Sequence, residues 1–227
     1  MSDLAELFDE YNILAAFGLT LLLTICSAVG SLLIGTIVAI LRVSPVAALR
    51  FFGTAYVTLV RNTPLTLIVV FCAFGFLNFM GLQLLPSSAS LIAQNAAWCV
   101  VALSIYHASF VAEAIRSGIN TVPIGQAEAA RAIGLNFSQT LGQVVLPQAF
   151  RGAIAPLGNT LIALTKNTTV VAAVGVTEAG LMMRNMIEFN PDYMFLIFGI
   201  VALGFVILTL PVGVTFTNFS RKLTVQR

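Results

Sequence analysis

The chain has 227 residues, of which 59% are hydrophobic and only 9% are charged, with a net charge of +2. A soluble domain carries about 25% charged residues. So few charges cannot keep so apolar a chain in water, which excludes a soluble globular fold. The apolar runs are continuous rather than alternating at every second residue, so we expect an all-α polytopic membrane protein and not a membrane β-barrel.

Apolar runs bounded by charged or turn-forming residues predict about five membrane-spanning helices, since one span needs about 20 apolar residues. The expected spans are Ile13–Leu41, Leu65–Met80, Ala89–Ala112, Gly152–Val176 and Tyr193–Phe219. The short apolar segment Phe51–Val60 either lies along the membrane interface or begins the next helix, and it would add a sixth span if it entered the bilayer. We therefore expect a transmembrane domain over residues 13–219, between tails of residues 1–12 and 220–227.

The charged residues predict how the chain is oriented. An odd number of spans places the two termini on opposite sides of the membrane. The first ten residues hold only acidic charges, at Asp3, Glu6, Asp9 and Glu10, whereas the C-terminal tail holds Arg221, Lys222 and Arg227. By the positive-inside rule the N-terminus is extracytoplasmic and the C-terminus cytoplasmic. The acidic start also lacks the basic residues of a cleavable signal peptide, so we expect the first apolar segment to remain as a membrane anchor.

The cysteines give no sign of metal or disulfide chemistry. Cys26, Cys72 and Cys99 all lie in apolar runs, and there is neither a CxxC pair nor a Cys/His cluster. We expect all three to be buried as small apolar side chains, with no metal site and no cofactor.

The longest loop on the expected cytoplasmic side, about residues 117–147, is predicted to contain two short helices. The alanine-rich segment Gln126–Ile133 has high helical propensity and ends at Gly134. A second helix is expected over Phe137–Val145, stopped by Pro147.

Small side chains share one face of the first of these helices. Ala127, Ala130, Arg131 and Gly134 follow the i, i+3, i+4, i+7 spacing, and such a face lets another backbone approach closely or lets the helix enter a groove. Glu128 and Arg131 are also spaced to form an ion pair. A solvated connecting helix would fit the composition, but a docking helix for a cytoplasmic partner explains the small residues better.

This loop carries a family resemblance. The stretch Gly125-Gln-Ala-Glu-Ala-Ala-Arg-Ala-Ile-Gly134, followed by Leu146-Pro-Gln-Ala-Phe-Arg151, resembles the EAA signature of bacterial ABC-importer permeases. Three further motifs resemble the polar amino-acid subfamily (histidine, glutamine, glutamate, arginine): Tyr56…Arg61-Asn-Thr-Pro-Leu65, Ala112-Glu113…Arg116 and Asn159…Lys166-Asn-Thr-Thr169. The resemblance covers residues 17–219, with departures at Asn62, where glycine is common, and at Thr169-Val170, where Ser-Leu is common.

The resemblance implies the type I permease fold of ABC importers, in a bacterial cytoplasmic membrane, moving a polar amino acid inward by alternating access. The implied partners are a dimer of cytoplasmic ABC ATPase subunits, a second permease that is a copy or a homologue, an extracytoplasmic substrate-binding protein and the lipid bilayer, with no nucleic acid. The implied ATPase-coupling residues are Gly125, Gln126, Glu128, Ala129, Ala130, Arg131, Gly134 and Pro147.

Polar residues within the apolar runs are candidates for the substrate pathway. They are Arg61, Asn159, Lys166, Asn167, Thr168 and Thr169. Lys166 either faces a cavity near the middle of the bilayer or anchors an oblique helix at the interface, and Arg61 either reaches the inner interface or attracts an anionic group. No acidic residue lies in Asn159–Thr169, which favours glutamate or glutamine over a cationic substrate. His107 is expected to serve helix packing, and Glu113 and Arg116 are expected to form an interfacial pair at the inner end of a span.

The chain is not expected to be an enzyme. It has no Gly-x-x-x-x-Gly-Lys-Ser/Thr loop, and neither Lys166 nor Lys222 follows a glycine, so ATP hydrolysis would require a separate subunit. Two alternative functions are compatible with the composition of the chain. A subunit of an ion-gradient-driven amino-acid carrier would be expected to show an internal repeat, which we do not find. A membrane scaffold without transport activity would not need the EAA-like loop.

Overall fold

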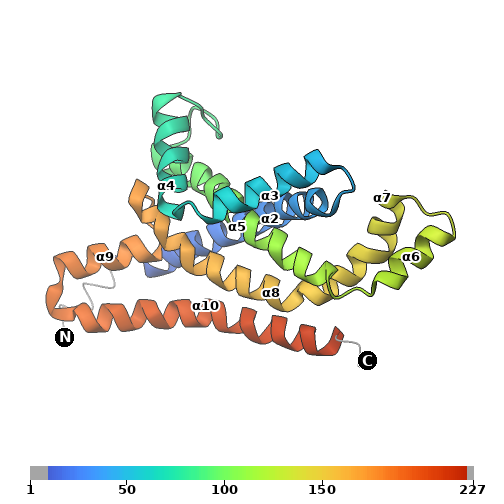
Figure 1. Cartoon of the computed structure of the whole chain (residues 1–227). Helices are drawn as coiled ribbons and strands as arrows, with labels where there is room; N and C mark the ends of the chain where they lie inside the picture. The colour runs from blue at the N-terminus through green and yellow to red at the C-terminus, as the bar shows by residue number, and fades with distance from the viewer. Residues whose placement is uncertain (1–9, 224–227) are drawn as a thin grey trace.

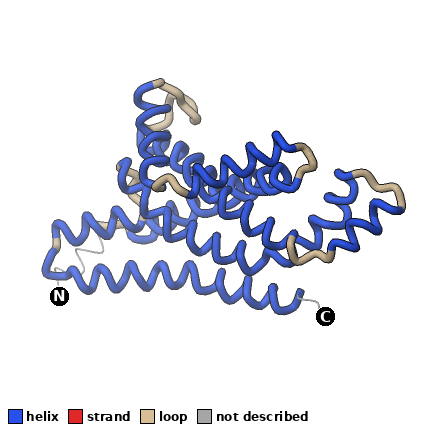
Figure 2. The backbone as a smooth tube through the Cα atoms, viewed as in Figure 1, coloured by secondary structure: helices blue, strands red, loops and turns tan. Residues whose placement is uncertain are grey.

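The computed structural model describes residues 10–223, and every regular element in that range is a helix (Figures 1 and 2). The elements are α2 Ile13–Val43, α3 Ala47–Arg61, α4 Leu65–Val70, η1 Phe71–Phe79, α5 Leu91–Ile119, α6 Ile124–Ala132, α7 Phe137–Gln139, η2 Thr140–Val145, α8 Leu146–Asn167, η3 Thr168–Val174, α9 Ala179–Phe189, η4 Pro191–Tyr193 and α10 Met194–Leu223. The predicted tails lie mostly outside the described residues, and Arg227 with them.

Up to five spans are present, which confirms the all-helical membrane fold. The helices α2 and α5, and α10 together with η4, are each long and apolar enough to cross a bilayer. Two bent pairs also pass this test: α3 with α4 and η1, at an angle of 102°, and the continuous helix from α7 to η3 with α9, at 57°. In both pairs the apolar run of the sequence is short or interrupted, and the helix is correspondingly broken.

The segment Phe51–Val60 belongs to α3, a separate helix before the 102° break. The break falls at Asn62 and Thr63, before Pro64, because proline disfavours helical geometry at the residue that precedes it. Phe51 and Phe52 are exposed in the chain. Of the two alternatives, the structure therefore favours a helix of its own over the straight beginning of the next one.

The helix α5 forms the centre of the bundle and packs between α2 and α8. Cys99, Ala102 and Leu103 are fully buried at its middle. Small residues allow the helices to come close: a methyl group on Gly35 of α2 would overlap Val111 of α5. Small side chains at the crossing points are typical of membrane helix packing, where van der Waals contact rather than the hydrophobic effect drives association.

The prediction that all three cysteines are buried is wrong for one of them. Cys72 and Cys99 are buried, but Cys26 is exposed on α2. It shares a face of that helix with the exposed side chains of Leu22 and Val29. An apolar run shows that a segment crosses the bilayer, but it does not show which side chains face the other helices.

A second close crossing joins α5 to α8 near the end of the bundle. A methyl group on Gly118 would overlap the backbone carbonyl of Ala149, and one on Gly152 would overlap the Thr121 hydroxyl. The two helices can therefore keep this separation only while position 118 is glycine, because the obstacle there is backbone rather than a side chain that could move.

We expect Gly118→Val to destabilise the protein by about 1–3 kcal/mol, because the α5–α8 crossing must widen to admit the side chain. The free energy of unfolding, measured by denaturant titration in mixed micelles, checks this. Gly199→Val is the matched control, since nothing lies within 4 Å of the position of its Cβ. Equal stability of the two variants would contradict the crossing described above.

Candidate functional site

A helical hairpin projects from one end of the bundle, with α6 as its first arm and α7 and η2 as its second (Figure 1). The sequence dictates both ends of the turn. Gly134 adopts a φ of 94°, which favours glycine, and ends α6. Asn136 then begins the second arm with a capping box, in which its side chain accepts a hydrogen bond from the backbone of Gln139 at 2.9 Å. The predicted first helix and its end at Gly134 are confirmed.

The prediction that Pro147 stops the second arm is wrong. The chain is helical without interruption from Phe137 to Val174, and Pro147 lies within this run at the start of α8. The preceding turn, Thr140–Val145, is a π-helix. Its wider turn changes the position of the carbonyl groups that the proline ring would otherwise meet, so the helix continues.

The face of small residues on α6 is turned toward the hairpin itself. Ala130 is buried, and α6 packs against η2. Ala127 and Arg131 line a cavity of about 520 Å³ between α6, η2 and the end of α5. Gln126 holds the two arms together, since its side-chain oxygen accepts a hydrogen bond of 2.6 Å from Gln148. The close approach expected for this face therefore takes place within the chain.

Other residues of α6 remain open to a partner. Gly125, Glu128 and Ala129 are exposed there. Ile124 and Ile133, at the two ends of the helix, are 77% and 82% exposed. Large apolar side chains so exposed on a projecting hairpin are typical of an interaction surface. We use the name outward face of α6 for the exposed surface that these five residues form; Ile124 also lies at the edge of the cavity that Ala127 and Arg131 line.

Sequence reasoning missed the two isoleucines, although large apolar side chains at the ends of a helix of small and polar residues were a signal for them. The expected ion pair between Glu128 and Arg131 is not formed. Within the described residues, 10–223, all ion pairs instead involve one acidic residue of α5, Glu113.

Three arginines from three helices gather around Glu113, beside the hairpin. Arg42 at the end of α2 contacts Glu113 with 2.6 Å between Nη1 and Oε1. Arg116, one turn along α5, donates from Nε to Oε2 at 3.0 Å, which confirms the expected pair. The side chains of Arg42 and Glu113 are only 12% and 24% exposed, so water screens this contact less than a surface pair.

Arg61 at the end of α3 is the third arginine of the cluster. Its Nη1 lies 3.9 Å from Glu113 Oε1, and its guanidinium lies over the ring of Phe110 at 5.0 Å. Arg61 therefore contacts a carboxylate of its own chain, from the last residue of α3. The cluster ties the ends of α2, α3 and α5 together where α3 bends into α4.

The other pathway candidates do not converge on one site. Asn159 and Lys166 are exposed on α8, whereas Thr168 is buried and donates to the carbonyl of Thr165 at 2.8 Å. Asn167 contacts the buried His107, with 3.2 Å between Nδ2 and Nε2. This contact joins α8 to α5 and agrees with the helix-packing role expected for His107.

Thr169 donates to the carbonyl of Lys166 at 2.8 Å, a local bond from η3 to the last turn of α8. None of the six candidates lines the cavity beside α6 or the groove between α8 and α10. Proximity along the sequence therefore did not bring these polar groups to one binding pocket.

A membrane bundle of about five helices, with a hairpin projecting at one end, is the architecture of the permease subunits of ABC importers. Residues 31–225 match the family described as "Binding-protein-dependent transport system inner membrane component". The chain belongs to this family and is a transport subunit rather than an enzyme. Membership of this family removes the support for an ion-gradient carrier or a scaffold.

Individual proteins resemble the chain over almost its whole length. It is 50% identical over 218 residues to "Glutamate transport system permease protein GluC" of Corynebacterium glutamicum, covering 95% of this chain and 96% of that protein. It is 35% identical to "Probable glutamine ABC transporter permease protein GlnM" of Bacillus subtilis, covering 97% and 98%. The solved structure "Crystal structure of an amino acid ABC transporter with histidines" matches with a TM-score of 0.77 and 26% identity, over 98% of this chain and 96% of that one.

Proposed function

We propose that this permease imports a polar amino acid, with glutamate favoured and glutamine next. The 50% identity to a glutamate transport permease over 95% of the chain carries the proposal. The lack of acidic residues over Asn159–Thr169 agrees with an acidic or neutral substrate, because a cationic amino acid would need a carboxylate to bind it.

We infer that the hairpin end of the bundle faces the cytoplasm of a bacterial cell, across the inner membrane. Arg42, Arg61 and Arg116 lie beside the hairpin. Arg151, at the start of α8, and Arg221, near the end of α10, lie at this same end of the bundle, because the two helices run antiparallel (Figure 1). Cytoplasmic ends of membrane helices carry such an excess of basic residues. The N-terminus would then be extracytoplasmic and the C-terminus cytoplasmic, with residues 13–219 as the transmembrane domain.

The ATPase partner is expected to dock on the outward face of α6. Of the coupling residues that the EAA resemblance implies, Gly125, Glu128 and Ala129 belong to that face and are available for direct contact. Ala130 and Gln126 would act indirectly, since Ala130 is buried against the hairpin and Gln126 accepts a hydrogen bond from Gln148. Arg131 is exposed beside the cavity and is also available for contact. Gly134 sets the turn, and Pro147 lies in the helix that carries motion from the hairpin into the membrane.

The other partners follow from the kind of transporter. A binding-protein-dependent importer needs an extracytoplasmic substrate-binding protein, a pair of ATPase subunits and a second permease, and we extend this composition to the present chain. The second permease is either a copy of this chain or a homologue of it.

Uptake by the reconstituted importer tests the substrate. The permease is assembled with its ATPase and binding protein in vesicles, and uptake of labelled glutamate, glutamine and arginine is followed with ATP inside. We expect glutamate or glutamine to be taken up and arginine to be excluded. Preferred uptake of arginine would overturn the substrate assignment while leaving ATP-driven transport established.

Lys166→Ala tests whether the lysine of α8 belongs to the substrate pathway. If it attracts the side-chain carboxylate of glutamate, the substitution should raise the KM for glutamate about fivefold, as expected for an exposed charge contact worth about 1 kcal/mol. Uptake of glutamine should change less. Arg184→Ala on α9 is the matched control. Unchanged selectivity and rate would remove Lys166 from the site.

A further inference from the structure

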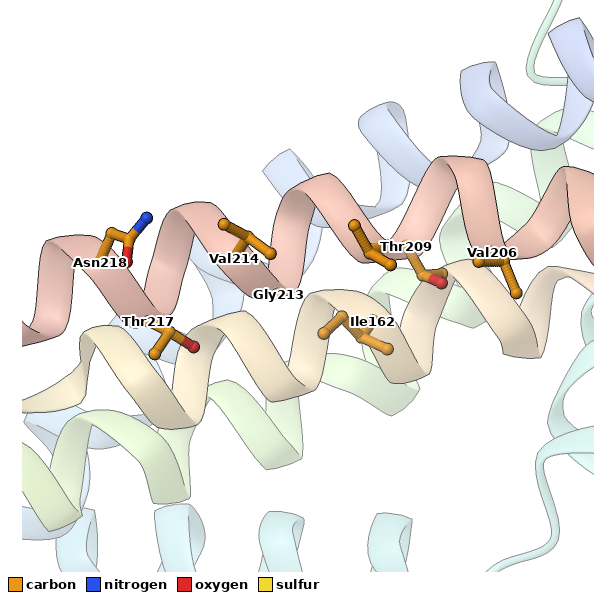
Figure 3. Close-up of a pocket in the computed structure, with 8 residues that line it drawn as sticks. Ile162, Val206, Thr209, Gly213, Val214, Thr217 and Asn218 are labelled. Carbon is orange, nitrogen blue, oxygen red and sulfur yellow. The ribbon is translucent and has the colours of Figure 1, made fainter.

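A shallow groove runs between α8 and α10 toward the hairpin end of the bundle (Figure 3). Its volume is about 540 Å³, and its apolar lining includes Ile162 of α8 with Val206, Leu210 and Val214 of α10. Only 11% of the most apolar stretch of α10 is buried. The groove therefore opens on the exposed surface of this chain.

The two helices run antiparallel in a register that the glycines define. A methyl group on Gly213 would contact Cδ1 of Ile162 at 3.4 Å, and one on Gly158 would overlap the ring of Phe216. Continuing this register by two turns brings Arg151 to the level of the last residues of α10. Arg151 also lies eleven residues, or about three turns, before Ile162, and therefore on the same face of α8.

Polar and then basic side chains follow the apolar part of the groove on α10. Thr217 and Asn218 line its end. Arg221 lies one turn after Thr217, and Lys222 lies one turn after Asn218, each on the same face of α10. Within residues 10–223, the side chains of Thr217 and Asn218 form no hydrogen bond. No ion pair in that range includes Arg221, Lys222 or Arg151.

We propose that this groove binds an anionic phospholipid. One acyl chain would lie along the apolar lining, and the phosphate would lie among Arg151, Arg221 and Lys222, with Thr217 and Asn218 as hydrogen-bond donors. Basic pockets between membrane helices are known to bind anionic head groups, and each basic residue near the surface strengthens binding about fivefold. A neutral protein surface would complement the apolar lining but would leave the three positive charges without a counter-ion.

Fluorescence quenching by brominated lipids tests the site in the full chain. Leu210→Trp places a reporter in the groove, and Trp98 of the wild type supplies the baseline. The protein is reconstituted in phosphatidylcholine with either brominated phosphatidylglycerol or brominated phosphatidylcholine. We expect phosphatidylglycerol to be preferred severalfold at the groove. We expect no preference at a control reporter, Leu33→Trp, whose parent side chain is exposed on α2.

Charge variants decide whether the basic residues cause that preference. Changing Arg151, Arg221 and Lys222 to glutamine should lower the preference stepwise at low ionic strength, from severalfold in the wild type to about one in the triple variant. Arg184→Gln, at the other end of the bundle, is the matched control and should leave it unchanged. The three positions are exposed, so an unchanged melting temperature is expected and is measured for each variant.

Three results would overturn the proposal. Equal quenching by the two lipids at Leu210→Trp would show a non-selective lipid contact. A preference that survives the triple substitution would show that other residues select the head group. Protection of the Leu210→Trp reporter from both lipids would show that a second protein, such as another permease copy, covers the groove. None of these results depends on which substrate is transported or in which direction.

Discussion

An Ile133→Asp variant is expected to lose ATP-driven uptake while it still folds and inserts into the membrane. Ile133 is 82% exposed on the projecting hairpin, so an aspartate there is solvated and leaves the bundle intact. At a docked ATPase the same carboxylate would be buried in place of an apolar contact. Loss of a central apolar contact costs about 2 kcal/mol or more, which weakens association about 30-fold.

Affinity of the purified ATPase for the permease in nanodiscs, together with vesicle uptake, measures this effect. Ser138→Asp is the matched control, because Ser138 is exposed on the second arm of the same hairpin. Glu128→Arg, on the outward face of α6, should weaken docking as well. Unchanged ATPase affinity in both Ile133→Asp and Glu128→Arg would refute the assignment of this face.

Replacement of Glu113 by glutamine is expected to destabilise the bundle by about 2 kcal/mol, since hydrogen bonds to charged groups contribute about 1.5–3 kcal/mol each. The isosteric amide removes the only negative charge among the three arginines of the cluster. Arg42 loses the strongest contact, because its side chain is only 12% exposed and its guanidinium lies 2.6 Å from the carboxylate. The free energy of unfolding in mixed micelles is the measurement.

A double-mutant cycle separates this contact from general loss of charge. Arg42→Gln alone should also destabilise, but the double variant should lose less than the sum, with a coupling of about 1 kcal/mol or more. Glu188→Gln, which removes an acid that forms no ion pair in the structure, should leave stability unchanged. Strict additivity of the two substitutions would show that the cluster does not hold α2 to α5.

Several features of this protein could be predicted from sequence because they are local. An apolar run of sufficient length must cross the bilayer as a helix, since the backbone has no other way to satisfy its hydrogen bonds there. The alanine-rich segment before Gly134 forms a helix by propensity, and glycine ends it because its φ of 94° suits no other residue as well. The pair Glu113–Arg116 is one helical turn apart, so its contact also follows from spacing.

The tertiary structure decided which faces and distant residues meet. Arg42 and Glu113 are 71 positions apart, and only the packing of α2 on α5 brings them together. Helical periodicity places Ala127 and Ala130 on one face of α6, but it does not determine whether η2 or a partner protein covers that face. Lys166 lies close to Asn167 and Thr168 in sequence but points to the surface while they are held inside. Composition and hydrogen bonding thus fixed the helices, whereas side-chain packing between them selected the outward face of α6.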